Sequence, residues 1–306
     1  MIDIIVLNFN NLEFTKMCIA SLYKNTTYPF KLIVVDNAST EPGTKEYFRT
    51  LEKEHNNVIV HFNEVPDSGF AEGNNIGLQY ADSEFICLLN NDIVIPKRKK
   101  WLETLLEHFK DEKVGLVGCK LLYPNDTIQF AGGHLCKDAF TTPKCFYHRG
   151  RFQDKELYSK VEEVPQLTFA FVISRKEVFG KLDEEYKIGT FEDNDKCMEL
   201  LTKGYKIIYD GRIFLYHYET ATQFKRNPQE WNNVQVANQM RFRNRWLPTI
   251  WLMLIENPTF WGWTNDDLNQ EIERMKRNGV LYNAVLSFQE WLNLTNYVRR
   301  AMKCSL

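Results

Sequence analysis

Two short polar segments contain residues that could carry out chemistry. The first, Asn90-Asn91-Asp92, directly follows the apolar run Phe85–Leu89. A carboxylate and an amide oxygen two residues apart can project to the same side, and such oxygen ligands suit Mg²⁺ or Mn²⁺. A cation held there could bridge and neutralise a diphosphate. The alternative is a loop in which Asn and Asp only form a turn.

The second segment, Glu192-Asp193-Asn194-Asp195, stands at the start of a predicted helix. An ionised carboxylate near a substrate hydroxyl could accept its proton as a general base. Carboxylates are also favoured at helix N-termini, so simple helix capping is the alternative. A carboxylate that acts as the base at this helix N-terminus is expected to stay ionised near neutral pH.

Histidine supplies a third candidate. His217 ends the strand-like run Phe214–His217 and could be a metal ligand beside Asp92, although a lone His among aromatic residues is more often a hydrogen-bonded core residue. A zinc site also needs consideration, because four potential ligands fall within a short stretch. Their spacing matches no common zinc site, and they are His134, Cys136, Cys145 and His148.

The elements that must position these residues alternate between two patterns in the first 120 residues. Short β-branched apolar runs predict buried strands, and segments with a helical apolar face lie between them. The predicted strands are Ile2–Asn8, Lys31–Asp36, Asn57–Phe62, Glu84–Leu89 and Val114–Leu122. The predicted helices run from a cap at Asn10 or Asn11 to about Lys24, then over Thr44–Glu54, Ala71–Ala81 and Pro96–Lys110.

This alternation predicts an α/β fold with a mostly parallel central sheet and helices on both faces. Such sheets bind ligands at the carboxyl ends of their strands. The polar residues Asn8, Asp36 and Asn90–Asp92 stand at three of these ends. Further strands are expected at Gln166–Ser174, Lys206–Tyr209 and Ile213–His217.

A helical region is expected after residue 220. Its two apolar stripes are Leu268, Ile272 and Met275, and Leu281, Val285, Phe288 and Leu292.

Composition excludes several classes of protein. The 306 residues are 44% hydrophobic with a net charge of −2, which argues against intrinsic disorder and against a general nucleic-acid binder. The seven scattered cysteines form no disulfide framework or CxxC motif. Neither a signal peptide nor a transmembrane run is recognised, so we expect a cytoplasmic protein, with contact at the cytoplasmic face of the membrane left open.

Six segments in order resemble the family 2 glycosyltransferases of the GT-A fold, and the rhamnosyltransferase-like subset in particular. The matches cover roughly residues 1–220. They are Ile5–Asn10 (IVLNFN), Leu32–Ser39 (LIVVDNAS), Gly69–Gly77 (GFAEGNNIG), Leu88–Val94 (LLNNDIV), His148–Gly150 (HRG) and Phe191–Cys197 (FEDNDKC).

The resemblance implies roles for individual residues. Asp36 would bind the base of the nucleotide donor, and Asp92, His217 and Asn90 would hold Mn²⁺ or Mg²⁺. Asp193 would be the general base, with Glu192 shaping acceptor binding. The remaining residues expected to line the nucleotide-sugar site are Asn8, Asn10, Asn37, Gly69, Asn75 and Asn91.

The resemblance also contains departures. Asn90 stands where the family's metal-binding element often has an acidic residue, and Tyr218 follows His217 where the family often has His or Gly. Asp67 replaces a frequent Asn before Ser68. The first two departures weaken the expected metal site.

The resemblance implies an inverting, metal-dependent hexosyltransferase for cell-surface polysaccharide or glycoconjugate assembly. Its donor would be a UDP- or dTDP-sugar, with GDP open, and its acceptor a glycan, a lipid-linked glycan or a protein. Residues 1–220 would form the catalytic domain, with a nucleotide-sugar half at 1–98 and an acceptor half at 99–220. Residues 221–306 would add a helical extension.

Three alternatives stay open. A sugar-nucleotide nucleotidyltransferase would need a Gly-rich phosphate loop, which NFNN after the first strand does not supply. A catalytically degenerate sugar-nucleotide or glycan-binding module is mildly favoured by Asn90. The aromatic segment Trp246–Trp263 could touch an anionic membrane or a lipid-linked acceptor, but we favour packing on the catalytic domain or on a second subunit of a homo-oligomer.

Overall fold

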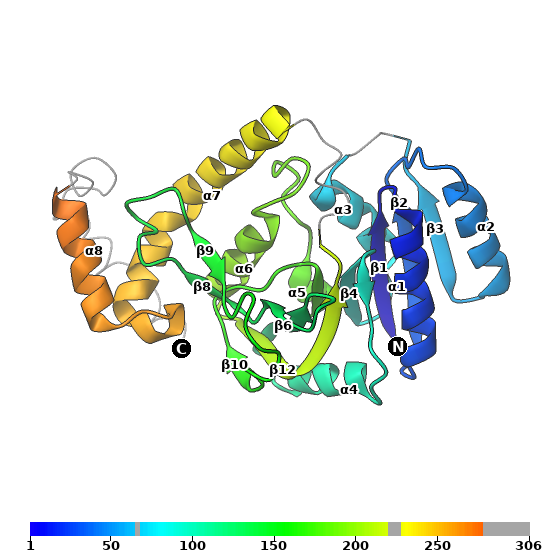
Figure 1. The fold of residues 1–306 in the computed structure, drawn as a ribbon, viewed down its shortest axis with the longest axis horizontal. Helices are drawn as coiled ribbons and strands as arrows, with labels where there is room; N and C mark the ends of the chain where they lie inside the picture. Colours follow the sequence, from blue (N-terminus) through cyan, green and yellow to red (C-terminus); the bar gives the residue numbers. More distant parts are fainter. Residues whose placement is uncertain (65–67, 220–227, 278–306) are drawn as a thin grey trace. The chain divides into compact units, whose positions relative to one another are not determined.

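The computed structural model describes residues 1–64, 68–219 and 228–277. Strands and helices alternate through the first half of the chain, as predicted (Figure 1). The helices are α1 (Leu12–Asn25), α2 (Thr44–Glu54), α3 (Phe70–Tyr80), α4 (Trp101–Leu106), η1 (Glu107–Lys110), α5 (Lys176–Phe179), α6 (Glu192–Thr202), α7 (Pro228–Glu256), η3 (Pro258–Trp261) and α8 (Asn265–Arg277). The strands are β1 (Ile2–Asn8), β2 (Phe30–Asp36), β3 (Val58–Phe62), β4 (Phe85–Asn90), β5 (Ile93–Val94), β6 (Val114–Leu122), β7 (Ile128–Phe130), β8 (Gly133–Leu135), β9 (Phe146–His148), β10 (Val161–Glu163), β11 (Phe171–Arg175) and β12 (Lys206–His217).

The N-terminal half of the main sheet is fully parallel, with strand order β4-β1-β2-β3. The register pairs Asn8 with Asp36 and Leu7 with Asn90, so the polar ends of three strands lie in one row. Continuous apolar runs form these strands because both faces of a parallel sheet are covered. The predicted boundaries agree with the structure to within one residue.

The second half of the sheet is mixed. β12 runs parallel to β6, whereas β11 is antiparallel to both β4 and β6. β5, β7 and β10 add further antiparallel pairs. β11 begins only at Phe171, later than predicted, because residues 168–170 lead into the site described below.

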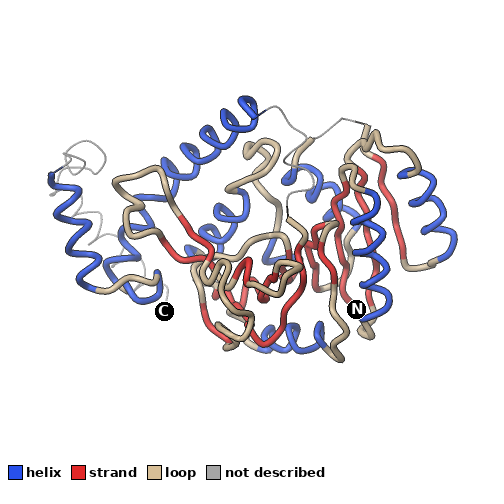
Figure 2. The backbone as a smooth tube through the Cα atoms, viewed as in Figure 1, coloured by secondary structure: helices blue, strands red, loops and turns tan. Residues whose placement is uncertain are grey.

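Helices cover both faces of the parallel half (Figure 2). Side chains alternate along β1, so Leu7 and Asn8 point to opposite faces. On one face, α3 packs so closely that a Cβ atom at Gly73 would overlap the side chain of Leu7. On the other face, Thr15 of α1 donates a hydrogen bond from its hydroxyl to Oδ1 of Asn8, at 2.6 Å. Gly73 in the GFAEGNNIG segment therefore serves close helix–sheet packing.

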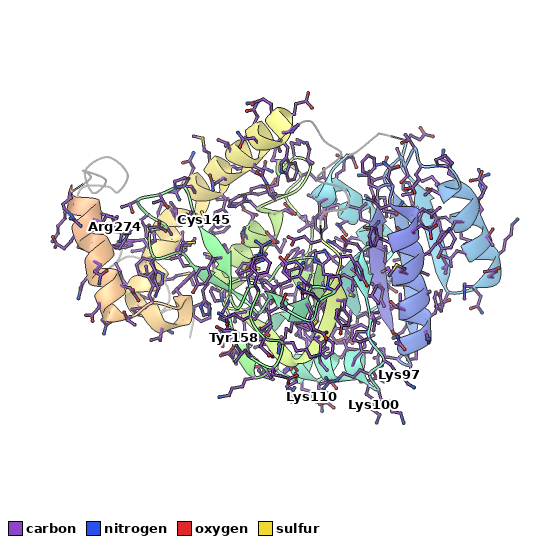
Figure 3. The ribbon with its side chains drawn as sticks, in the orientation of Figure 1. Lys97, Lys100, Lys110, Cys145, Tyr158 and Arg274 are labelled. Atoms are coloured by element: carbon purple, nitrogen blue, oxygen red, sulfur yellow. The ribbon has the colours of Figure 1, made fainter. Side chains whose placement is uncertain are left out.

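The α4 helix is shorter than predicted. It begins at Trp101 rather than at Pro96, and it ends in the 3₁₀ turn η1. Four consecutive basic residues, at 97–100, are exposed, and Lys100 has a left-handed φ of 57°. Figure 3 shows Lys97 and Lys100 extending away from the protein. Adjacent like charges and the left-handed residue disfavour a helical turn here.

β12 forms one strand where two were predicted. The register shifts between Asp210 and Phe214, where a bulge accommodates the polar residues in the middle of the strand. Both carboxylate oxygens of Asp210 accept from the guanidinium of Arg212, at 2.9 and 2.7 Å. The bulge carries the chain on to His217 at the end of the strand.

The predicted side-chain cap of α1 is wrong. Asn10 and Asn11 both have left-handed backbone angles, and Asn11 makes no capping hydrogen bond. Instead the carboxylate of Glu41 accepts from the amide of Leu12, at 3.1 Å. Oδ1 of Asn10 accepts from the amides of Thr40 and Glu41, so Asn10 places the residue that caps the helix.

The chain divides into two compact units. The first comprises residues 1–133 and 148–240, and the second comprises residues 134–147 and 241–306. The division falls inside α7, twenty residues beyond the boundary expected at residue 220, and it assigns residues 134–147, which form most of the β8–β9 hairpin, to the second unit.

The second unit has its own aromatic core. Trp261 and Trp263 are almost fully buried, and the indole of Trp263 donates to the carbonyl of Leu135, at 3.0 Å. Phe140 packs edge-on against Trp251 at a centroid distance of 4.8 Å. These tryptophans therefore stabilise the unit itself. Contact of these tryptophans with a membrane or a second subunit stays a prediction.

Two features named in the sequence analysis lie outside the described residues. They are the apolar stripe of Leu281, Val285, Phe288 and Leu292, and Asp67.

Within the described ranges, no helix combines the length and apolar character that crossing a bilayer requires, and this includes α7. The six cysteines in those ranges are all free thiols, and five of them are buried.

Candidate functional site

The site is a cavity of about 420 Å³ at the carboxyl edge of the parallel strands. This is the edge where parallel sheets bind ligands. It brings together eight of the predicted residues: Asn37, Gly69, Asn90, Asn91, Asp92, Glu192, Asp193 and His217. The polar ends of β2, β4 and β12 thus meet the start of α6 in one place.

Strand pairing places Asp92 beside His217. β5 pairs antiparallel with the end of β12, and the amide of Tyr218 donates to the carbonyl of Asp92, at 3.0 Å. As a result Oδ1 of Asp92 lies 3.1 Å from Nε2 of His217. That oxygen is buried and no hydrogen bond of ordinary geometry reaches it.

Gln129 fixes the tautomer of His217. Nδ1 of the imidazole lies 2.6 Å from Oε1 of Gln129. The amide group of Gln129 donates to the carbonyl of His217 and to Glu219, which sets its orientation. Nδ1 therefore carries the proton, and the lone pair of Nε2 faces the Asp92 carboxylate, an arrangement that requires a proton or a cation between them.

Asp92 and His217 each favour the charged form of the other. Burial alone would raise the pKa of Asp92, but His217 outweighs this effect and the pKa of Asp92 is lowered. Burial alone would lower the pKa of His217, and Asp92 reverses this, so the pKa of His217 is raised. The site therefore favours an anionic Asp92 facing positive charge.

A network of hydrogen bonds lies beneath the cavity, at the ends of β1 and β2. Oδ1 of Asp36 accepts from Nδ2 of Asn8 at 2.8 Å and from the hydroxyl of Ser39 at 2.5 Å. The side-chain amide of Asn91 joins the same network, because it donates to Oδ1 of Asn8 and to the hydroxyl of Thr15. Oδ2 of Asp36 is buried without a hydrogen-bond partner. Asp36 therefore has one buried acceptor oxygen that the network leaves unsatisfied.

Not every predicted residue lies in the cavity wall. Asn8 and Asp36 lie beneath it in the network just described, and Asn10 holds the loop that caps α1. Asn75 is buried and exchanges hydrogen bonds with Leu182, while also donating to Glu184. Asn75 therefore anchors the segment after α5, away from the residues that line the cavity.

A strained loop carries the acidic residues. Ile188, Thr190 and Phe191 have φ values of 65°, 92° and 69°, a region that residues with a Cβ atom rarely adopt. The loop is fixed from the α3 side, because the amide of Phe70 donates to the carbonyl of Ile188 at 2.8 Å. A Cβ atom at Gly69 would lie 2.9 Å from the amide nitrogen of Ile188.

The loop delivers Glu192 and Asp193 to the cavity as the first residues of α6. Burial, followed by the charge of the neighbouring Asp193, raises the pKa of Glu192 to about 8. Burial also raises the pKa of Asp193 to about 6, although backbone amides at Asn194 and Asp193 oppose the shift. The helix N-terminus does not keep Glu192 ionised at neutral pH, because burial outweighs the dipole. Asp195 is structural: it accepts from the hydroxyl of Tyr186, at 2.9 Å.

The model of glycosyl transferase family 2 matches residues 3–182, which is more than half of the sequence. The chain belongs to glycosyl transferase family 2. The resemblance in the sequence motifs is thereby confirmed, and the matched range contains Asn37 and Asp92, which line the cavity at the polar strand ends.

The chain is also similar to individual proteins and solved structures. RfbC of Myxococcus xanthus, an O-antigen biosynthesis protein, is 28% identical over 218 residues, covering 69% of the family 2 chain and 17% of RfbC. The structure of GalNAc-T7 with UDP, GalNAc and Mn²⁺ matches with a TM-score of 0.67 at 15% identity, covering 99% of this chain and 58% of that one. The mannosyltransferase PcManGT of Pyrobaculum calidifontis, with GDP-Man and Mn²⁺, matches with a TM-score of 0.53 at 15% identity, covering 98% and 85%. These structures share the predicted GT-A fold, and the chain spans 38% or less of the length of the curated relatives that it matches.

The described residues supply only some of the ligands that a divalent cation needs. In the described part of the chain, no three His, Cys, Asp or Glu side chains are grouped so as to hold a metal. The four zinc candidates, His134, Cys136, Cys145 and His148, are among these described residues and form no such group. Asp92 and His217 nevertheless fit Mn²⁺ or Mg²⁺, because these ions keep water and phosphate oxygens among their ligands.

Several residues that line the cavity were given no role in it by the sequence analysis. His148 lines the cavity edge-on to Phe130, and burial, followed by Arg151, lowers its pKa to about 4. Only the HRG match pointed to it. Glu219 and Trp231 also line the cavity, and no motif marked them.

Proposed function

We propose that the chain transfers a hexose, with inversion, from a nucleoside diphosphate donor to an acceptor hydroxyl. UDP or dTDP is the expected nucleotide, and the products belong to cell-surface polysaccharide or glycoconjugate assembly. The proposal rests on one observation: the Asp92–His217 pair and the Glu192–Asp193 pair open into the same cavity. It is supported by the UDP and Mn²⁺ held by GalNAc-T7 and by the O-antigen role named for RfbC.

The donor would lie across the ends of β1, β2 and β4. The free Oδ2 of Asp36 would accept from the N–H of a pyrimidine base. Asp92 and His217 would hold a divalent cation, which supplies positive charge to the departing diphosphate. Asn90 would add a neutral amide oxygen to the same wall.

Asp193 would act as the general base. Its pKa of about 6 leaves it ionised at neutral pH, whereas Glu192, with a pKa of about 8, keeps its proton. The acceptor oxygen attacks the anomeric carbon from the face opposite the diphosphate. The new C–O bond forms as the bond to the diphosphate breaks, the acceptor proton passes to Asp193, and the nucleoside diphosphate leaves with the bonding electron pair. A base at this position contributes about 10²–10⁴-fold to the rate.

A donor-turnover assay tests the proposal. Purified protein is incubated with UDP-, dTDP- and GDP-sugars and Mn²⁺, and release of nucleoside diphosphate is followed with water or added saccharides as acceptors. We expect one nucleotide class to turn over, a sugar product of inverted anomeric configuration by NMR, and loss of turnover in Asp193→Asn. Retained configuration, or no turnover with any donor by folded protein, would contradict the proposal.

A further inference from the structure

Phe152 is the most exposed large hydrophobic side chain of the described residues, at 67%. Its φ of 66° lies in the left-handed region, which a residue with a Cβ atom occupies at a cost. Solubility and backbone strain both disfavour an aromatic residue here. Strain and apolar exposure that persist together at one residue point to a function for it.

The turn that carries Phe152 is held firmly. The amide of Phe152 donates to the carbonyl of Ile128 at 2.7 Å, and the amide of Ile128 donates to the carbonyl of Gln153 at 2.8 Å. The amide of Gln153 also closes the turn on the carbonyl of Gly150, at 2.9 Å. The exposed ring therefore projects from a fixed backbone.

Two neighbours orient the ring. Tyr123 stacks on Phe152 with a centroid distance of 5.3 Å and an interplanar angle of 9°. The guanidinium of Arg151 lies 5.1 Å from the Phe152 centroid, and its Nε donates to the Tyr123 hydroxyl at 2.9 Å. We call Tyr123, Arg151 and Phe152 the aromatic platform.

The aromatic platform is joined to the cavity through Glu219. Glu219 lines the cavity, and its Oε2 accepts from the Tyr123 hydroxyl at 3.1 Å and from Arg151 at 3.4 Å. The turn also starts at the cavity, because His148, another lining residue, precedes it. A ligand that spans Glu219 can therefore touch both the cavity and the platform.

We propose that the aromatic platform binds one pyranose ring of a saccharide acceptor. The apolar C–H face of the sugar would lie on Phe152, and its hydroxyls would pair with Arg151 and Glu219. A single exposed ring matches the width of a six-membered sugar. The flanking charges are one positive and one negative, which suits a neutral polyol better than an anionic lipid or a charged peptide. This inference rests on the proposed function and names the substrate class of the acceptor side.

Saturation-transfer NMR tests the proposal directly. The probes are methyl pyranosides of glucose, galactose, mannose, rhamnose and N-acetylglucosamine, in the presence of UDP and Mg²⁺. We expect saturation on the C–H face of at least one sugar and a loss of about fivefold in Phe152→Gly, the change expected when one aromatic contact is removed. Glycine suits the positive φ, so this variant should fold at least as well as the parent. Phe152→Tyr should keep the signal.

The control is Leu157→Ala, which removes another exposed apolar side chain from the same segment. Its saturation signals should match those of the parent. Equal signals in the parent and in Phe152→Gly, or no signal from any sugar, would overturn the platform. Thermal stabilisation by UDP or dTDP with Mg²⁺ is measured on the same proteins. Its absence with both nucleotides would count against the proposed function, whereas its presence alongside unchanged sugar signals would count against the platform alone.

Discussion

The side-chain amide of Asn238, on α7, donates to the carbonyl of Lys187 at 3.0 Å and reaches the carbonyls of Gly189 and Thr190, both at 3.3 Å. These carbonyls belong to the strained loop that precedes Glu192. One buried amide therefore holds in place the backbone that presents the proposed base.

Replacing Asn238 tests this role. Asn238→Ala should lower kcat by about tenfold or more, because small displacements of catalytic groups are costly. Binding of the nucleotide should be unchanged, since Asn238 does not line the cavity. Steady-state kinetics and nucleotide titration separate the two effects. The matched control is Asn233→Ala, an exposed position on the same helix. Weaker nucleotide binding with an unaltered kcat would show that Asn238 does not act through the loop.

Gly69 meets the same loop from the other side. Gly69→Ala would place a methyl group 2.9 Å from the backbone nitrogen of Ile188, at a φ of 93°. Gly180→Ala is the control, because its φ of 62° imposes similar strain while nothing lies within 4 Å of the new carbon. The control should lose about 1 kcal/mol from its free energy of unfolding, and Gly69→Ala should lose more. Equal losses in urea denaturation would argue against close packing at Gly69.

The parallel half of the sheet and its ligand-binding edge could be predicted from the sequence. Short, β-branched apolar runs such as Ile2–Asn8 favour buried strands, and the polar residues at their ends mark the edge. The GFAEGNNIG segment was equally informative, since its Gly73 allows α3 to pack closely on Leu7 of β1.

Features that depend on distant pairing could not be predicted. His217 was expected beside Asp92, but the two-residue strand β5 that brings them together was not, because Ile93–Val94 is too short to carry a periodic signal. The positive φ values at Ile188 and Thr190 oppose local propensity and are imposed by contacts from α3 and α7. The second unit combines residues 134–147 with a distant helical segment, which no local pattern indicates.

The pH dependence of the reaction follows from Asp193. A base with a pKa of about 6 is protonated in acid, so kcat/KM should fall about tenfold per unit as pH drops below 6. Asp193→Asn should lose at least about 100-fold at pH 7. Glu192→Gln should retain more activity, because Glu192 is already protonated at that pH. A pH–rate profile without an acidic limb, or a greater loss in Glu192→Gln than in Asp193→Asn, would reassign the base.

Glu192 should also make stability depend on pH. Its pKa rises from 4.5 to about 8 on folding, so between these values the folded state holds a proton that the unfolded state releases. Stability therefore falls as pH rises through this window. Glu192→Gln removes the effect, so its Tm should exceed that of the parent at pH 8, and the difference should shrink toward pH 4.5. A constant difference across this range would contradict the raised pKa.

Nucleotide binding tests most directly whether Asp92 and His217 hold the cation of a nucleotide-sugar site. Thermal unfolding is measured with UDP, dTDP and GDP, each with and without Mn²⁺, in the parent, in Asp92→Asn and in the exposed control Asp82→Asn. A ligand present at about 100 times its Kd stabilises the folded state by about 2.7 kcal/mol. We predict that one nucleotide raises Tm only with Mn²⁺ in the parent and in Asp82→Asn, and that Asp92→Asn abolishes the rise. No rise with any nucleotide, or an undiminished rise in Asp92→Asn, would contradict the account.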